Sequence, residues 1–92
     1  MAQSKLQTEK ECYLCHSKVN LEDHHIFNGP KRKLSETDGL KVWLCHYHHT
    51  GSNNSAHLNH EVALFLKQKG QEEYEKTHTR VQFVKRYGKS YL

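Results

Sequence analysis

Apolar and polar residues alternate in two short stretches of the first half of the chain. Residues 24–27 have strand character and end at the Asn-Gly-Pro of residues 28–30, which is a strong turn signal. Residues 40–44 follow a glycine and begin with apolar and polar residues in alternation, as a second strand does. The pattern predicts a hairpin of two short strands joined by a long basic loop, after a turn-like stretch at residues 19–23.

The middle of the chain has the spacing of an amphipathic helix. Apolar residues recur at i, i+4, i+7 and i+8, and we expect all of them to face the core: Leu58, Val62, Phe65 and Leu66. This periodicity predicts a helix over about residues 56–69, with its continuation to residue 76 left open.

A second, shorter helix is predicted near the C-terminus. Val81, Val84 and Tyr87 fall at i, i+3 and i+6, which places them on one helical face. Thr79 is a suitable N-cap, and Gly88 stands where a residue with left-handed backbone ends a helix. The elements together predict an α+β domain in which a two-stranded hairpin packs on a helix and an additional C-terminal helix follows.

The length and composition predict one small domain with a weak core. The chain has 92 residues and 35% of them are hydrophobic, so little apolar surface is buried and a cross-link is expected. We expect residues 1–11 to be a flexible leader and residues 12–92 to form a single domain. Within it, a metal-binding knuckle and the core occupy residues 12–69, and a helical extension occupies residues 70–92.

Cysteine and histidine are the residues that can supply this cross-link. The chain has 3 Cys and 9 His, and three cysteines cannot all pair as disulfides. Two half-sites repeat the same spacing, Cys12-x2-Cys15 and Cys45-x2-His48. Each can bring two ligands to one ion from a tight turn, and three thiolates with one imidazole are typical of structural Zn²⁺. The sequence therefore predicts a zinc site that contributes to folding.

The fourth zinc ligand has two candidates. His49 stands at a spacing of x3 from Cys45, which zinc sites also tolerate, whereas His46 adjoins Cys45 and cannot easily bind the same ion. We prefer His48 because it repeats the spacing of the first half-site. This choice leaves His49 available for a second function.

Several histidines remain that a structural zinc cannot use. They are His24, His25, His49, His57 and His60. Successive side chains of a strand point to opposite faces of the sheet. One member of the His24–His25 pair can therefore bind a metal while the other faces a substrate.

These segments resemble the HNH endonuclease family, the ββα-metal nucleases, and especially small HNH proteins encoded by phages and prophages of Gram-positive bacteria. The matching segments are Cys12-x2-Cys15, His24-His25-Ile26, Gly39-Leu40 and Leu44-Cys45-x2-His48-His49. The resemblance implies a zinc-stabilised ββα-metal (HNH) fold that hydrolyses phosphodiester bonds of DNA with the help of a divalent metal ion.

The resemblance also implies a role for each histidine. His24 falls at a metal-ligand position, His25 at the position of the general base that activates water, and Ile26 at the apolar position that follows. The metal ligand that the family carries on its helix falls at His49. An alternative register would make Asp23 the metal ligand and His24 the base.

The third ligand of the catalytic metal is left open by the family pattern. His57 is the candidate, with His60 or water as alternatives. Imidazole ligands favour Mn²⁺, Ni²⁺, Co²⁺ or Zn²⁺ over Mg²⁺, which prefers oxygen.

The chain departs from the family pattern at two places. The middle Asn of the family, which helps to fix the loop around the base, is absent, and Asp38, Gly39 and Leu40 stand in its region. The orientation of His25 must therefore come from other residues. His48 also replaces the cysteine that is more common in the second half-site.

The net charge of +4 favours a polyanionic partner such as DNA. Lys31, Arg32 and Lys33 are the candidate nucleic-acid contacts, acting on phosphates rather than bases. Little sequence specificity is expected because no base-reading module is visible, and Phe27 and Trp43 are expected in the core. The competing hypothesis is a non-catalytic zinc module that binds nucleic acid or a phage or recombination protein.

The sequence predicts no contact with a membrane. It contains no apolar run near the roughly 20 residues that a membrane span needs, and its N-terminus has no apolar segment typical of a secretory signal. Reduced cysteines together with these features favour the cytoplasm, and the resemblance to phage and prophage proteins implies that of a bacterial host cell.

Overall fold

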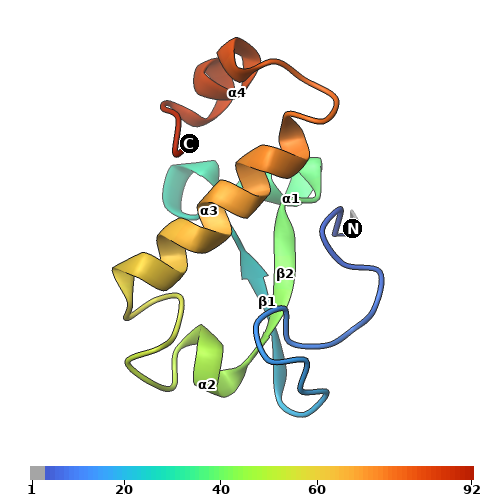
Figure 1. Cartoon of the computed structure of the whole chain (residues 1–92), viewed down its shortest axis with the longest axis vertical. Helices are drawn as coiled ribbons and strands as arrows, with labels where there is room; N and C mark the ends of the chain where they lie inside the picture. The colour runs from blue at the N-terminus through green and yellow to red at the C-terminus, as the bar shows by residue number, and fades with distance from the viewer. Residues whose placement is uncertain (1–3) are drawn as a thin grey trace.

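The computed structural model describes residues 4–92, which form a two-stranded antiparallel sheet surrounded by short helices. The elements in chain order are β1 (Leu21–His25), the 3-10 turn η1 (Gly29–Lys31), α1 (Arg32–Asp38), β2 (Lys41–Cys45), α2 (His46–His49), α3 (His60–Tyr74) and α4 (Arg80–Tyr87). In Figure 1, α3 crosses the hairpin, α2 follows the lower end of β2, and α4 lies beyond the far end of α3. The predicted α+β class is confirmed. No helix within residues 4–92 combines the length and the apolarity that crossing a membrane requires.

The hairpin extends further toward the N-terminus than the sequence pattern predicts. Its register runs from Leu21 opposite Cys45 to His25 opposite Lys41, so the expected turn at residues 19–23 is wrong over most of its length. The two acidic residues at positions 22–23 interrupt the alternation of apolar and polar residues that would predict a strand. This segment becomes a strand by pairing with β2. Val42 and Leu44 are buried on one face, and His24 shares that face because directly opposite residues lie on the same side.

The connection between the strands is helical rather than an extended basic loop. Pro30 lies in the first turn of η1, where its fixed φ suits a helix. Gly39 ends α1 with a left-handed φ of 70°. Ser35 of α1 is fully buried, and its hydroxyl donates to the Leu40 carbonyl and accepts from the Phe27 amide. The sequence does not reveal this helix because Leu34 is its one apolar residue.

Helix α3 begins later than predicted, and only part of the expected apolar face is buried. Asn59 caps it by accepting from the amides of Glu61 and Val62. Leu66 is fully buried, but Leu58 is 63% exposed and Phe65 is 42% exposed, so their expected place in the core is wrong. Leu58 precedes the helix, so the spacing of residues along the helix does not place it on the buried face. The buried face is set instead by residues four apart, Leu66, Gly70 and Tyr74.

Helix α4 confirms the expected cap and the expected end. Thr79 accepts from the Gln82 amide in a capping box, and Gly88 follows with a φ of 97°. Phe83 and Tyr87 are buried against Phe27, with ring centroids 5.5 Å and 4.5 Å from it. Val81 is instead 72% exposed and Val84 is 36% exposed, so of the three residues predicted to share a helical face Tyr87 alone lies in the core.

Residues 4–11 contact the hairpin, although a flexible leader was expected there. The Lys5 amide donates to the Gly39 carbonyl at 2.8 Å, and the Ser4 hydroxyl donates to the Lys41 carbonyl. The side chain of Gln7 accepts from the Trp43 amide at 2.7 Å, so it satisfies a backbone donor of β2. Residues 1–3 of the expected leader lie outside the described residues.

Candidate metal centres

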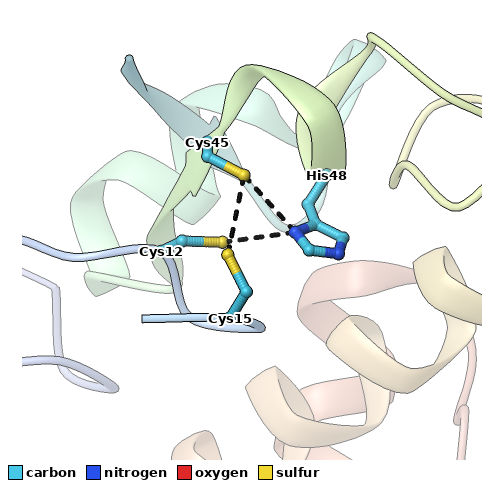
Figure 2. A group of neighbouring side chains, drawn as sticks. All are labelled: Cys12, Cys15, Cys45 and His48. Carbon is cyan, nitrogen blue, oxygen red and sulfur yellow. Dashed lines mark hydrogen bonds between the residues drawn. The ribbon is translucent and has the colours of Figure 1, made fainter. Parts of the chain in front are cut away.

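Three cysteines and one histidine converge where the chain enters and leaves the hairpin. Cys12 and Cys15 lie in the turn before β1, Cys45 ends β2, and His48 lies in α2. Their ligand atoms all lie within 4.8 Å of one another, and Figure 2 shows the sulfurs and the imidazole turned toward a common centre. The three cysteines are free thiols. The predicted set of four zinc ligands is therefore brought together in space.

The geometry of this Cys₃His group fits a tetrahedral zinc ion. Zinc–ligand bonds of about 2.3 Å for sulfur and about 2.0 Å for nitrogen imply about 3.8 Å between two sulfurs and about 3.5 Å between sulfur and nitrogen. The Cys15 and Cys45 sulfurs are 3.8 Å apart. His48 Nδ1 lies 3.7 Å from the Cys12 sulfur and 3.4 Å from the Cys45 sulfur. The residues can therefore hold zinc, which would connect the start of β1 to the end of β2.

The turn around Cys12 also favours its thiolate form. Burial alone raises the pKa of this thiol, but backbone amides of Cys45, Cys15 and Leu14 outweigh burial and lower the pKa to about 6. The pKa of Cys15 is raised: the Ser17 amide acts to lower it, but burial and the neighbouring sulfurs of Cys12 and Cys45 prevail. Cys12 is therefore the thiol that is most readily present as a thiolate at neutral pH.

The structure separates the three neighbouring histidines of α2. His48 belongs to the Cys₃His group, as preferred from its spacing. The side chain of His46 is 62% exposed and lies 3.3 Å from a Glu22 oxygen. His49 points to a different group of side chains, so the alternative in which it completes the zinc site is not supported by the geometry.

His24, His49 and His57 form a second group that could hold a metal ion. Their ligand nitrogens lie within 4.8 Å of one another, and Nε2 of His57 is 3.1 Å from Nε2 of His49. Two imidazole nitrogens bound to one ion at about 2.1 Å would be about 3.0–3.4 Å apart, depending on the coordination geometry. The His57 amide donates to the His49 carbonyl at 3.2 Å, which holds the loop after α2 against this group.

The three histidines come from β1, α2 and the loop before α3. Burial and the neighbouring His49 and His57 lower the pKa of His24 to about 3. Burial and His49 also lower the pKa of His57. Both rings are therefore neutral at physiological pH, which is the form that binds a metal.

Glu22 orients His49, and sequence reasoning missed it. Its carboxylate accepts from Nδ1 of His49 at 2.7 Å, and this hydrogen bond lowers the pKa of Glu22. Nδ1 of His49 therefore carries the proton, and the lone pair of Nε2 faces His57. A carboxylate behind a histidine in this way is common in metal sites. The available signal was the position of Glu22 two residues before His24, on the same face of the strand.

His25 points to the opposite face of the hairpin from His24, as its strand position predicts. Its Nε2 lies 2.8 Å from an oxygen of Glu36 in α1, and its side chain is 8% exposed. Asp23 lies close to His25 and Glu36, and it is not part of the group formed by His24, His49 and His57. The geometry therefore does not support the alternative register with Asp23 as a ligand beside His49. Glu36 was missed because it lies on a helix that the sequence does not reveal.

The basic candidates lie at the start of α1. Arg32 and Lys33 are exposed and Lys31 is half-buried, so all three can be reached by solvent. Of the two aromatic residues expected in the core, Phe27 is buried there and Trp43 is half-buried beneath the ammonium of Lys10, 4.5 Å away.

His57 and His60 provide a direct test of the second group. We expect His57→Ala to weaken binding of Ni²⁺ to zinc-loaded protein by at least about 10-fold, because one of the three imidazoles is lost. His60→Ala is the matched control, since His60 is exposed and the group that contains His24 and His49 does not include it. Isothermal titration of both variants with Ni²⁺ measures the difference. Equal affinities in the two variants would remove His57 from the site.

The similarity searches identify no relative that could assign a role to these groups. No protein-family model, no curated protein and no solved structure gives a significant match to the chain. The established findings are thus an α+β fold with a Cys₃His group suited to zinc and a separate three-histidine group that could hold a metal ion.

Proposed function

We propose that the protein is a metal-dependent endonuclease of the HNH, or ββα-metal, type that hydrolyses phosphodiester bonds of DNA. The observation that carries this proposal is the three-histidine group, which is separate from the Cys₃His group and whose member His24 directly precedes His25 in the chain. A structural zinc protein needs the Cys₃His group alone. The second group and the neighbouring histidine are the parts of a hydrolytic site.

In this proposal the two groups have different tasks. The Cys₃His group holds structural zinc, and His24, His49 and His57 hold the catalytic cation. A divalent ion supplies charge neutralisation at the phosphate and stabilises the leaving oxygen. His24 and His57 contribute as neutral rings because burial lowers the pKa of each. His49 is held by Glu22, which fixes the nitrogen that it offers.

His25 would act as the general base that takes a proton from the attacking water. The lone pair of a neutral imidazole can take this proton. Its low exposure restricts its motion, and its contact with Glu36 gives the ring a fixed partner. Lys31, Arg32 and Lys33 would contact phosphates of the bound strand and add to the affinity without reading bases.

The test is cleavage of supercoiled plasmid by zinc-loaded protein with Mn²⁺, Ni²⁺ or Mg²⁺ added in turn. We expect nicked circles to appear with at least one of these ions. His49→Ala is the control, because it removes a ligand of the second group and leaves the four residues of the Cys₃His group in place. Retarded migration of the plasmid without nicking under every condition would contradict the nuclease and support a non-catalytic nucleic-acid-binding module.

A further inference from the structure

We propose that Glu36 is a positioning residue that holds the base, His25, in one tautomer and one orientation; the inference rests on the proposed function. Nε2 of His25 lies 2.8 Å from Oε1 of Glu36. A carboxylate can only accept a hydrogen bond, so the neutral ring must carry its proton on Nε2. The other ring nitrogen, Nδ1, then has the lone pair that can take a proton from water.

Glu36 is itself held in place by a buried ammonium group. Nζ of Lys41 lies 3.0 Å from both carboxylate oxygens of Glu36, and Lys41 is 6% exposed. Lys41 is also the residue directly opposite His25 in the hairpin. Since an ammonium only donates, this bidentate contact fixes the carboxylate that in turn fixes the ring.

The same side chains do not favour a further metal site. Asp23, His25 and Glu36 are close enough to hold an ion. The ammonium of Lys41, however, lies 3.0 Å from Glu36 and 3.9 Å from Asp23, so it already supplies the positive charge between the two carboxylates. A divalent cation would have to displace a buried lysine. The arrangement is that of a hydrogen-bonded network around a histidine.

A purely structural explanation of Glu36 makes a different prediction. Glu36 could serve only to neutralise Lys41, because a buried ammonium without a partner is costly. Its loss would then lower stability, and any effect on cleavage would be independent of His25. A positioning role acts through His25, so it must vanish when His25 is absent.

A double-mutant cycle separates the two explanations. Glu36→Gln keeps the size of the side chain but can present either an oxygen or an N–H to the ring, so the tautomer is no longer fixed. We expect kcat for plasmid nicking to fall by about 100-fold with little change in KM, as for a misplaced catalytic group. In the His25→Ala background the same substitution should cost nothing further. Glu72→Gln, on the exposed side of α3, is the matched control.

The ring tautomer of His25 is a readout that does not depend on cleavage. Long-range proton–nitrogen NMR spectra of ¹⁵N-histidine-labelled protein should show the proton of His25 on Nε2 in the wild type and a changed tautomer population in Glu36→Gln. The His25→Ala variant assigns the signals. Both variants are compared with the wild type for fold and zinc content.

The outcomes distinguish the failure of this inference from failure of the proposed function. A wild type that never nicks DNA overturns the nuclease, whereas the tautomer still decides whether Glu36 holds the ring. A wild-type proton on Nδ1, or equal losses from Glu36→Gln with and without His25, overturns the positioning role. The positioning role is supported if the wild-type ring carries its proton on Nε2 and Glu36→Gln slows nicking only when His25 is present.

Discussion

Cys12→Ser is expected to leave most of the chain unfolded, even though the substitution changes one atom. Cys12 is the fully buried cysteine of the Cys₃His group, and its thiol is the one whose pKa is lowered to about 6. Structural zinc in small domains contributes about 10–16 kcal/mol of binding free energy. A domain of ordinary size is stable by only about 5–15 kcal/mol. Losing the ion therefore removes an amount comparable to the whole stability.

Two measurements check this expectation. The variant should bind less than one zinc per chain and should give a narrow, poorly dispersed proton–nitrogen NMR spectrum. The chain offers no cysteine outside the group as a matched control, since all three belong to it. Chelation of the wild type followed by added zinc replaces that control, and the native spectrum should disappear and return. A zinc-free variant with the wild-type spectrum and melting temperature would show that the fold does not need the metal.

In the proposed nuclease, His25→Ala is expected to leave only a slow residual nicking rate while both groups still bind metal. General-base catalysis by a positioned side chain contributes about 10²–10⁴-fold to a rate, and the loss should fall in this range. The fold should survive because His25 is the last residue of β1. The four residues before it keep their pairing with β2. Initial nicking rates of zinc-loaded wild type and variant at saturating Mn²⁺ measure the effect.

The control for His25→Ala must show that the metal sites are intact. Nickel titration and zinc content of the variant should match those of the wild type. His78→Ala is the matched histidine variant, because His78 is exposed and stacks on Tyr74, away from both metal groups. It should nick DNA at the wild-type rate. Normal nicking by His25→Ala would show that another group activates the water.

The ligands of the Cys₃His group were predictable because their signal is local, whereas His49 and His57 were placed beside His24 only by the resemblance to HNH proteins. The x2 spacing places Cys12 beside Cys15 and Cys45 beside His48 without any knowledge of the fold. The alternation of a strand separates His24 from His25 in the same way. Such short-range rules depend on two or three residues, so they hold wherever the local element forms.

The residues that support these ligands were not predictable because their contacts depend on tertiary structure. Glu36 reaches His25 only because α1 forms between the strands, and α1 has too few apolar residues to be visible as a periodic pattern. Its end is held by Asp38, which accepts from Arg86 and Tyr87 of α4 at 2.6 Å each. Gln7 reaches β2 through a side-chain contact that no periodicity encodes.

Helix α2 carries His48 of one metal group and His49 of the other in consecutive positions. An ion at the first group restrains the backbone that also presents a ligand to the second. Metal binding at one group therefore changes the free energy of metal binding at the other. Such coupling is reciprocal: an ion at either group raises the affinity of the other group by the same factor. Loading of the chain with metal is therefore expected to be cooperative, and chelation of metal from the Cys₃His group is expected to weaken metal binding by the three histidines.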